Sequence, residues 1–343
     1  MIQKISVSEF LEKAKSYPVF DVRTPSEFYK GHIPGAHNLP LFTDEERAVV
    51  GTLYNKKGRE TAILEGLDFV GPRMRNMVET VQNTSQSKTV LIHCWRGGMR
   101  SGSVAWLINY FGYTVFTLEG GYKSFRNAML DELQKVRRFI VIGGRTGSGK
   151  TGLLGKLKNY GFQVVDLEGL ASHKGSAFGS IGMGTQPRQE HFENLLGFRL
   201  MSMNADQPII LEDESRKIGG LQLPNSIYDQ IRESPLIYID VEKAERIQNL
   251  LLDYKTENKA ELIHSVQKIR ENIGGQLMTE ALDFIEQDRF DLCADVLLGY
   301  YDKTYDYGVS LRNPDKIHCV GYSGTNQQLS EEMVRLIQSV SKI

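Results

Sequence analysis

Cysteine is scarce in this sequence. The 343 residues include three cysteines, Cys94, Cys293 and Cys319, and their spacing is not that of a zinc site. An odd number of widely separated cysteines also argues against a disulfide framework. We therefore expect a reducing, cytoplasmic environment, in which a lone cysteine has to be explained by its own surroundings.

Long apolar segments are also missing. No stretch of about 18 apolar residues occurs, so we expect no membrane-spanning helix and no membrane partner. The first residues alternate between polar and apolar, so we expect no signal peptide. With 41% hydrophobic and 24% charged residues, the composition is typical of globular proteins, and the length favours about two domains.

A large net charge is absent, but acidic residues are missing from two segments. The formal charge of −1 balances 41 basic against 42 acidic side chains. Residues 135–158 nevertheless contain seven Lys or Arg and no Asp or Glu, and residues 80–118 contain no acid either. Such local positive charge would concentrate anions there, RNA phosphates included. Charges also cluster by chance on solvated faces, which is the alternative.

Short apolar runs alternate with helical patterns along the chain. Strands that alternate with helices predict α/β domains with parallel sheets, which bind ligands at the carboxyl ends of their strands. The predicted helices of the first part are residues 101–111 and 120–133. The predicted strands are residues 19–22, 89–93 and 114–118, then 139–142, 163–166, 208–211, 236–240 and 316–320.

Two segments interrupt this alternation. Residues 43–87 are rich in charged and helix-forming residues with glycine breaks, and we interpret them as a helical insertion, either a structural filler or a substrate-binding element. Residues 242–302 show apolar residues at helical spacing. We therefore predict a first domain at residues 1–133, which carries the insertion, and a second at residues 134–343.

Cys94 stands at the end of a predicted strand and precedes a glycine pair and a helix. The glycines let backbone N–H groups turn inward as an anion nest, and the helix start adds its positive dipole end. Nearby arginines add charge, and together these effects lower a thiol pKa. We predict that Cys94 is the nucleophile, while a buried structural cysteine is the alternative. The residues predicted to bind its oxyanion substrate are Arg96, Gly97, Gly98 and Arg100.

A second glycine-rich loop, residues 144–151, follows a predicted strand and opens a helix. This is the context of a P-loop, in which backbone N–H groups wrap phosphates. Lys150 would bridge the phosphates and Thr151 could hold Mg²⁺. The predicted phosphate-binding residues are Gly144, Arg145, Thr146, Gly147, Ser148, Gly149, Lys150 and Thr151.

Further polar residues follow other predicted strands. The acids after the strand at 208–211 stand where a P-loop enzyme places an acid near Mg²⁺ or water. Each residue taken alone could equally be a solvated loop residue. The residues predicted to support the phosphate site are Asp166, His173, Lys174, Glu212, Glu214, Ser215 and Arg216.

The first domain resembles the rhodanese family. The resemblance lies in the motifs at residues 20–28 and 31–40, in His93-Cys94, and in the closing turn at residues 118–122. In that family the cysteine carries transferable sulfur as a persulfide, and Cys94 falls on that position. The spacing from Cys94 to Arg100 also fits the Cys-x5-Arg phosphatases of the same fold, so phosphatase activity stays an alternative.

A rhodanese domain followed by a P-loop domain is similar to the tRNA 2-selenouridine synthase family. The motifs at residues 94–101, 143–151, 173–179 and 212–216 carry this resemblance, which covers essentially the whole chain. It implies a transferase that converts a wobble 5-substituted 2-thiouridine of tRNA into 2-selenouridine. The implied steps are S-geranylation by geranyl diphosphate, then selenium transfer from selenophosphate through a perselenide on Cys94.

The same resemblance implies the partners. These are the anticodon loop of tRNA, geranyl diphosphate, selenophosphate and the enzyme that makes selenophosphate; no tightly bound cofactor is expected besides Mg²⁺. The alternatives are a sulfur carrier coupled to an ATP- or GTP-dependent P-loop enzyme, and a non-catalytic RNA-binding module. The sequence does not locate a pocket for the geranyl chain, for which residues 242–302 and 43–87 are the candidates.

Overall fold

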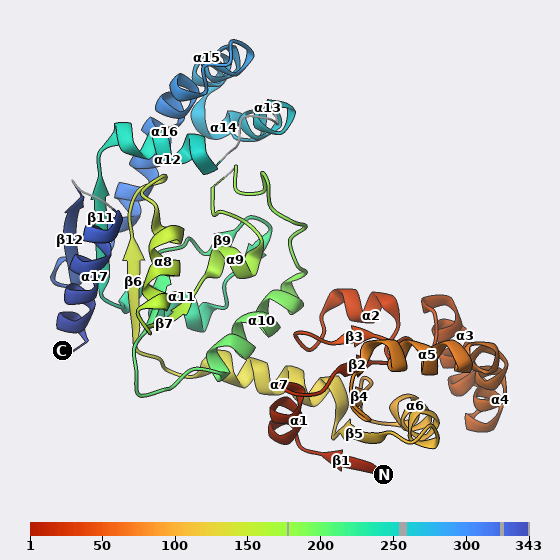
Figure 1. The fold of residues 1–343 in the computed structure, drawn as a ribbon. Helices are drawn as coiled ribbons and strands as arrows, with labels where there is room; N and C mark the ends of the chain where they lie inside the picture. The colour runs from red at the N-terminus through yellow and green to blue at the C-terminus, as the bar shows by residue number, and fades with distance from the viewer. Residues whose placement is uncertain (177, 254–258, 323–325, 342–343) are drawn as a thin grey trace. The chain divides into compact units, whose positions relative to one another are not determined.

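The chain forms two compact units. The computed structural model describes residues 1–176, 178–253, 259–322 and 326–341 (Figure 1). The first unit comprises Met1–Glu132 and Arg188–Phe198, and the second comprises Leu133–Pro187 and Arg199–Ile343. Each unit contains one five-stranded sheet, which confirms the predicted α/β fold class.

The sheet of the first unit is entirely parallel, in the order β1-β5-β4-β2-β3. The three inner strands agree with the predicted ones. The edge strands β1 and β3 were not predicted, because β1 buries only Ile5 and β3 is two residues long. The strands are β1 (Ile2–Ile5), β2 (Val19–Asp21), β3 (His37–Asn38), β4 (Thr89–His93) and β5 (Thr114–Leu118).

Helices flank this sheet, and two of them begin at capping boxes. Ser6 with Glu9 caps α1, and Thr24 with Glu27 caps α2, each pair satisfying two backbone N–H groups. This Ser/Thr-x-x-Glu spacing was a sequence signal for two helices that the apolar pattern alone did not predict. The helices are α1 (Val7–Ala14), α2 (Pro25–Lys30), α6 (Met99–Tyr110) and α7 (Gly121–Gln134).

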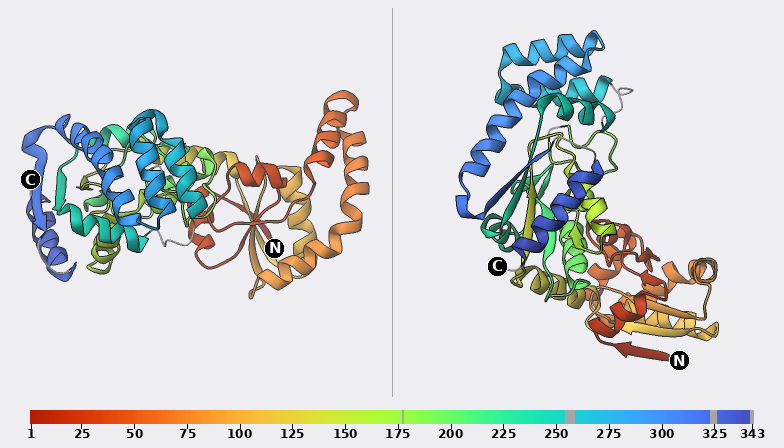
Figure 2. Two further views of the ribbon diagram at one scale, coloured as in Figure 1. Left: turned by 90° about the horizontal axis from the view of Figure 1, so that it is seen from above. Right: turned by 60° about the vertical axis from the view of Figure 1, so that its left-hand side comes forward.

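The predicted insertion at residues 43–87 is helical. Figure 2 shows its helices, in orange, as a group beside the sheet. Helix α3 has no buried residue, and Leu64 and Leu67 of α4 stay exposed. The first two helices of the insertion therefore add little to the core of the first unit, whereas its last helix packs Met77, Val78 and Val81 into that core. It consists of α3 (Asp44–Lys57), α4 (Arg59–Val70), η1 (Gly71–Arg73) and α5 (Met74–Thr84).

Helix α10 (Gln189–Met201) returns from the second part of the chain to the first unit. The Asn194 amide donates to the hydroxyl of buried Tyr122 (2.7 Å), and that hydroxyl donates to Glu190 (2.8 Å). A division of the sequence into contiguous segments, 1–133 and 134–343, does not describe this crossing.

The sheet of the second unit is also parallel, in the order β12-β11-β6-β8-β7. All five strands were predicted within one or two residues, since each contributes apolar side chains to the core of this unit. The edge strand β12 is not buried on both faces, because Cys319 is exposed. The strands are β6 (Phe139–Gly143), β7 (Gln163–Val165), β8 (Ile209–Glu212), β11 (Leu236–Val241) and β12 (Ile317–Tyr322). The shorter elements around them are α8 (Lys150–Asn159), α9 (Leu167–Ala171), β9 (Lys217–Ile218), β10 (Leu221–Gln222), α11 (Asn225–Glu233), η2 (Pro314–Lys316) and α17 (Asn326–Val340).

The predicted helical segment at 242–302 is helical in the described residues; 254–258 lie outside them. Figure 1 shows α13 to α15 beyond the carboxyl end of β6. This group has its own apolar core, which includes Phe178, Ile285 and Leu297. In the ranges that the structure describes, no helix has the length and apolarity needed to cross a membrane. The helices are α12 (Lys243–Asp253), α13 (Lys259–Lys268), α14 (Arg270–Ile273), α15 (Gly275–Glu286) and α16 (Phe290–Ser310).

Candidate functional site

The cysteine loop follows β4 directly. Cys94 is buried, and its sulfur lies 3.2 Å from the hydroxyl of Ser101 on α6. Burial raises the pKa of the Cys94 thiol, but hydrogen bonds from Ser101 and from the N–H groups of Gly98 and Arg96 outweigh it and hold the pKa below its ordinary value. A lowered pKa favours the nucleophilic thiolate, as the sequence predicted.

The two arginines of this loop contribute less directly than we expected. Arg96 is exposed, and its backbone N–H rather than its guanidinium is what contacts the sulfur. Arg100 donates to the carboxylate of Glu27 on α2 at 2.6 Å. Its guanidinium would have to break this ion pair to bind an oxyanion. The anion nest in this structure is therefore made of backbone, and ligand binding by the arginine side chains stays a prediction.

Ser101 offers a direct test of the hydrogen bonds that lower the pKa. We expect Ser101→Ala to raise the pH at which Cys94 becomes a thiolate, because the variant loses one donor to the sulfur. The pH dependence of thiolate ultraviolet absorbance measures this midpoint, with Cys94→Ala as the blank. Ser103→Ala is the control, since the Ser103 hydroxyl bonds Met99 and Arg100 carbonyls instead. An unchanged midpoint in Ser101→Ala would contradict the assignment.

The turn after β5 closes the cysteine loop from the other side. Tyr122 N–H donates to the Cys94 carbonyl at 2.8 Å. Gly121 has a φ of +61°, and a Cβ there would lie 2.5 Å from Gly97 N and 2.7 Å from Arg96 N. Backbone atoms cannot move aside as a flexible side chain can, so only glycine fits.

We therefore expect Gly121→Ala to distort the loop and destabilise the first unit by at least about 3 kcal/mol. Gly35→Ala is a matched control, because Gly35 also has a positive φ (+80°) but open space around its Cα. It should cost only about 1 kcal/mol of backbone strain. Chemical denaturation of both variants makes the comparison, and equal losses would show that crowding at the loop is unimportant.

The second loop has the predicted P-loop context, since it joins β6 to α8 and Gly149 caps the helix. Lys150 Nζ lies over the loop and donates to the Gly144 carbonyl at 2.7 Å. The N–H of Gly144 donates to the hydroxyl of Tyr305 at 2.7 Å. Lys150 is thus already placed above the loop that would bind phosphate.

Helices α12 and α16 hold this loop. Buried Arg246 donates to the Thr146 carbonyl (3.2 Å) and forms two 2.7 Å hydrogen bonds with Asp302. Arg145, predicted to bind phosphate, instead pairs with Asp306 of α16 at 2.8 and 2.9 Å. The helical segment therefore fixes the conformation of the phosphate loop, a function that we had not predicted for it.

Carboxylates lie next to the P-loop threonine. The Thr151 hydroxyl donates to Glu168 at 3.4 Å, and the Glu168 N–H donates to Glu212 at 2.8 Å. Burial raises the pKa of Glu212 to about 8, and burial together with Glu168 raises the pKa of Glu214 well above its ordinary value. Glu212 is therefore mostly protonated at neutral pH when no cation is near.

The Thr151 hydroxyl and the Glu168 carboxylate fit a magnesium ion that arrives with a phosphate-bearing substrate. In the described part of the chain, no group of three or more His, Cys, Asp or Glu side chains is arranged to hold a metal. Mg²⁺, however, commonly uses one or two carboxylates plus phosphate oxygens. Thr151 and Glu168 would hold the ion, which would neutralise diphosphate charge.

One open cavity is lined both by the phosphate loop and by some of the predicted supporting residues. It is lined by residues 147–151 and also by Asp166, Lys174, Glu214 and Ser215. Buried His173, Glu212 and exposed Arg216 do not line it.

Several of these supporting residues have structural contacts. Asp166 caps α9 by accepting from Gly169 N at 2.6 Å, and Lys174 donates to the Asp253 carbonyl at 3.0 Å. Ser215 donates to the Lys217 carbonyl at 2.5 Å. The Arg216 guanidinium lies 5.0 Å from the Tyr228 ring. Catalytic roles for these residues stay predictions.

Three site residues were missed by the sequence reasoning. Glu168 lies two residues beyond a predicted strand, so its position was a usable signal. Arg246 and Tyr305 lie about 100 and 160 residues beyond the loop they contact. A charged or tyrosine residue within a helix carries no local sign of such a partner.

Comparison with known proteins covers both units. Residues 6–128 match the rhodanese-like domain, and residues 137–287 match the tRNA 2-selenouridine synthase AAA domain. The chain is 36% identical over 326 residues to the tRNA 2-selenouridine synthase of Marinobacter nauticus, covering 84% of this chain and 88% of the relative. The enzyme of the same name from Hydrogenovibrio crunogenus is 34% identical over 328 residues, covering 85% and 89%.

The relative from Nitrosomonas europaea is also called tRNA 2-selenouridine synthase. It is 38% identical over 264 residues, which are 75% of this chain and 67% of the relative. The order of domains, the two anion-binding loops and these matches agree. The chain belongs to the tRNA 2-selenouridine synthase family.

Proposed function

We propose that this protein converts a wobble 2-thiouridine of tRNA into 2-selenouridine in two steps at two loops. Geranyl diphosphate alkylates the sulfur at the phosphate loop, and selenophosphate supplies selenium at the cysteine loop. One observation supports the proposal most strongly: the chain belongs to this family and has both anion-binding loops. Each loop follows the carboxyl end of a strand in a parallel sheet.

The first step makes the sulfur a better leaving group. The sulfur of the base attacks the first carbon of the geranyl group, so a C–S bond forms and the C–O bond to diphosphate breaks. Negative charge grows on the departing diphosphate. Lys150 and the N–H groups of residues 147–151 lie where they can stabilise that charge.

The second step replaces the alkylated sulfur. The Cys94 thiolate attacks selenium, which forms an S–Se bond and breaks the Se–P bond. The perselenide then attacks C2 of the base, and geranylthiolate leaves. A second thiol then attacks the Cys94 sulfur, so that an S–S bond forms and the S–Se bond breaks with its electron pair going to selenium. The products are 2-selenouridine and a disulfide on Cys94, which a further thiol reduces.

This route has a definite phosphorus product. Because the electron pair of the Se–P bond leaves with phosphorus, a perselenide on Cys94 requires phosphite as the coproduct. Phosphorus NMR of a completed reaction detects it. Phosphate in its place would contradict the perselenide and would mean that selenium reaches the base as selenide.

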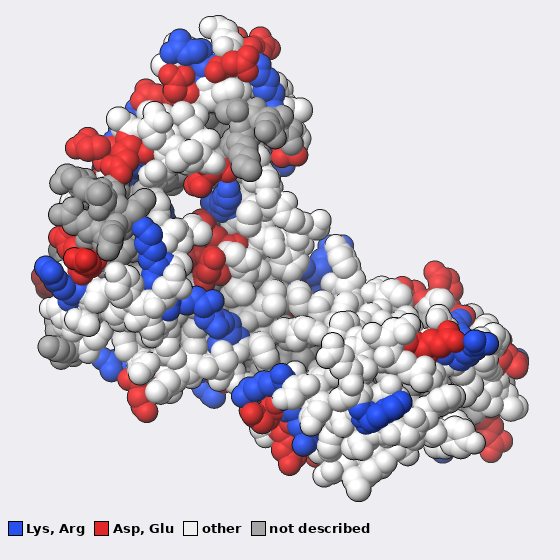
Figure 3. All heavy atoms as spheres, viewed as in Figure 1, with Lys and Arg blue, Asp and Glu red and all other residues white. Residues whose placement is uncertain are grey.

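The tRNA surface is proposed from charge. Lys135 and Arg138, in the acid-free segment, are exposed, and Arg138 also donates to the Ser341 carbonyl at 2.9 Å. Arg145 is held by Asp306, and Lys150 is held by the Gly144 carbonyl. Figure 3 shows basic side chains interspersed with acidic ones on the face it draws. We therefore propose that a few exposed basic residues contact phosphates, and that the unstacked anticodon loop supplies the reacting base.

The overall proposal is tested by nucleoside mass spectrometry of tRNA incubated with the protein. Geranyl diphosphate alone should yield S-geranyl-2-thiouridine, and both donors together should yield 2-selenouridine. Formation of neither product, with steady ATP or GTP hydrolysis instead, would favour a nucleotide-driven sulfur carrier.

A further inference from the structure

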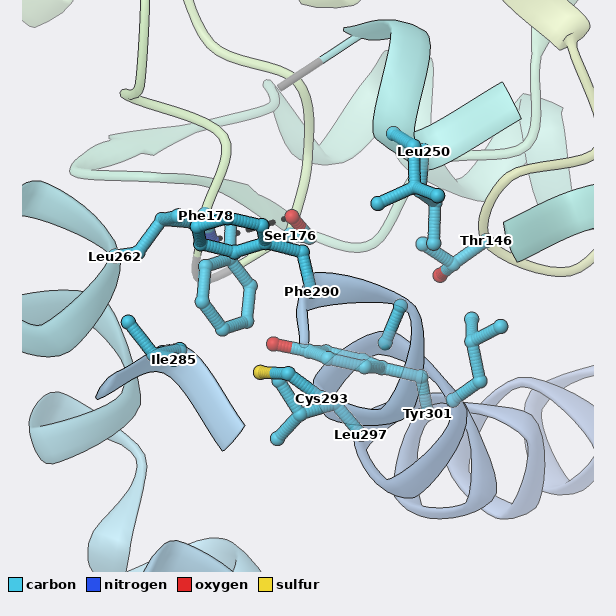
Figure 4. Close-up of a pocket in the computed structure, with 13 residues that line it drawn as sticks. Thr146, Ser176, Phe178, Leu250, Leu262, Ile285, Phe290, Cys293, Leu297 and Tyr301 are labelled. Carbon is cyan, nitrogen blue, oxygen red and sulfur yellow. Dashed lines mark hydrogen bonds between the residues drawn. The ribbon is translucent and has the colours of Figure 1, made fainter. Parts of the chain in front are cut away.

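The second unit contains an apolar cavity in its helical segment. Helices α12, α13, α15 and α16, the loop after α9 and the phosphate loop line a cavity of about 80 Å³ that is partly open to solvent (Figure 4). The lining residues are Thr146, Ser176, Phe178, Leu250, Leu251, Leu262, Ile285, Phe290, Cys293, Ala294, Leu297, Leu298 and Tyr301.

This cavity adjoins the phosphate site. Thr146, Ser176, Leu250 and Tyr301 line both the apolar cavity and the open cavity of the phosphate loop. In Figure 4, Thr146 and Leu250 lie at one end, while Phe178, Leu262 and Ile285 lie at the other. A ligand whose diphosphate sits on the loop would therefore extend an apolar group past Thr146 towards Phe178.

The relative position of loop and cavity is fixed. Arg246 bonds both the Thr146 carbonyl and Asp302, and the Asn249 amide donates to the Gly147 carbonyl at 2.9 Å. These contacts join the loop to α12 and α16, two walls of the cavity. A chain attached to a bound diphosphate would meet a preformed apolar site rather than one assembled on binding.

The chemistry of the lining favours hydrocarbon over a nucleotide base. Apart from the hydroxyls of Thr146, Ser176 and Tyr301, the lining side chains are aliphatic or aromatic, with one thiol. Burial raises the pKa of that thiol, Cys293, to about 12, as expected in an apolar environment. A base would leave most of its ring nitrogens and amines without hydrogen bonds there, whereas an isoprenoid has no polar group to satisfy.

We infer that this cavity is the subsite for the geranyl chain, which rests on the geranylation proposed above. The insertion also borders an apolar groove, lined by residues such as Phe42, Tyr54, Leu67 and Met99, but no residue of the phosphate loop lines it. Of the two regions that the sequence left open, the helical segment is the one connected to the diphosphate site.

Filling the cavity should change the preferred chain length. Ala294 lines the cavity from α16, so Ala294→Phe should lower kcat/KM for geranyl diphosphate at least about tenfold. Dimethylallyl diphosphate, with one isoprene unit instead of two, should lose much less. Gly299→Phe is the control, because Gly299 lies exposed on the same helix with open space at its Cα; its preference should equal that of the unmodified protein.

Enlarging the cavity provides the opposite test. Leu297→Ala should improve the use of farnesyl diphosphate, with three isoprene units, relative to geranyl diphosphate. If neither substitution moves the chain-length preference of a protein that still alkylates tRNA, the subsite is wrong while the proposed function stands. If the unmodified protein alkylates no tRNA with geranyl diphosphate, the proposed function itself fails. Weakened ATP binding in Ala294→Phe, with geranyl use unchanged, would make the cavity a base pocket and overturn the inference.

Discussion

Cys94→Ala is expected to abolish 2-selenouridine formation while geranylation continues. The variant lacks the sulfur whose pKa is lowered by Ser101 and the backbone N–H groups of the cysteine loop, and losing a catalytic nucleophile commonly costs at least about a thousandfold in rate. The phosphate loop lies in the other unit and keeps all its contacts. Mass spectrometry should therefore detect S-geranyl-2-thiouridine that accumulates instead of being consumed.

Cys319→Ala is the matched control, since Cys319 is a second free cysteine and is exposed. It should form 2-selenouridine at the normal rate. If Cys94→Ala also made selenouridine at that rate, Cys94 would have no part in selenium transfer and a structural role would explain it better.

Lys150→Ala is expected to reduce geranylation by about a hundredfold to a thousandfold. The effect follows from charge, because the ammonium group above the phosphate loop is the residue best placed to stabilise the leaving diphosphate. The rate of S-geranyl-2-thiouridine formation at saturating tRNA measures it.

Lys303→Ala controls for the loss of one positive charge, because Lys303 is exposed on α16 and lines neither cavity of the second unit. Its geranylation rate should be unchanged. A Lys150→Ala protein that geranylates at the normal rate would show that diphosphate departs elsewhere.

The two anion-binding loops could be predicted because the residues that form each of them are contiguous in the sequence. The strand, the loop and the helix that form each anion site are contiguous, as in β4 with Cys94 and β6 with residues 144–151. Apolar runs define the strands and glycines define the loops. Both loops could therefore be located at the carboxyl ends of the strands that they follow in the structure.

The binding partners of the charged side chains could not be predicted in the same way. Arg100 and Arg145 were expected at ligands, but the structure pairs them with Glu27 and Asp306. Those partners lie 73 and 161 residues away in the sequence. An arginine's partner depends on tertiary folding, and its residue type does not tell whether the partner is a ligand or a carboxylate.

The apolar cavity could not be predicted from the sequence for a related reason. Its walls come from four helices and two loops. Helical periodicity places Leu250 and Ile285 on apolar helix faces without showing what those faces contact. An apolar helix face most often packs against another helix, so a cavity between such faces becomes visible only in the folded structure.

The central claim is that alkylation and selenium transfer use different loops. The most direct measurement gives Lys150→Ala tRNA that already carries S-geranyl-2-thiouridine, together with selenophosphate, and follows 2-selenouridine. The account predicts formation at close to the normal rate, because the cysteine loop is intact and the step that needs Lys150 has been supplied. A rate reduced as strongly as that of geranylation would contradict it and would place both steps at one site.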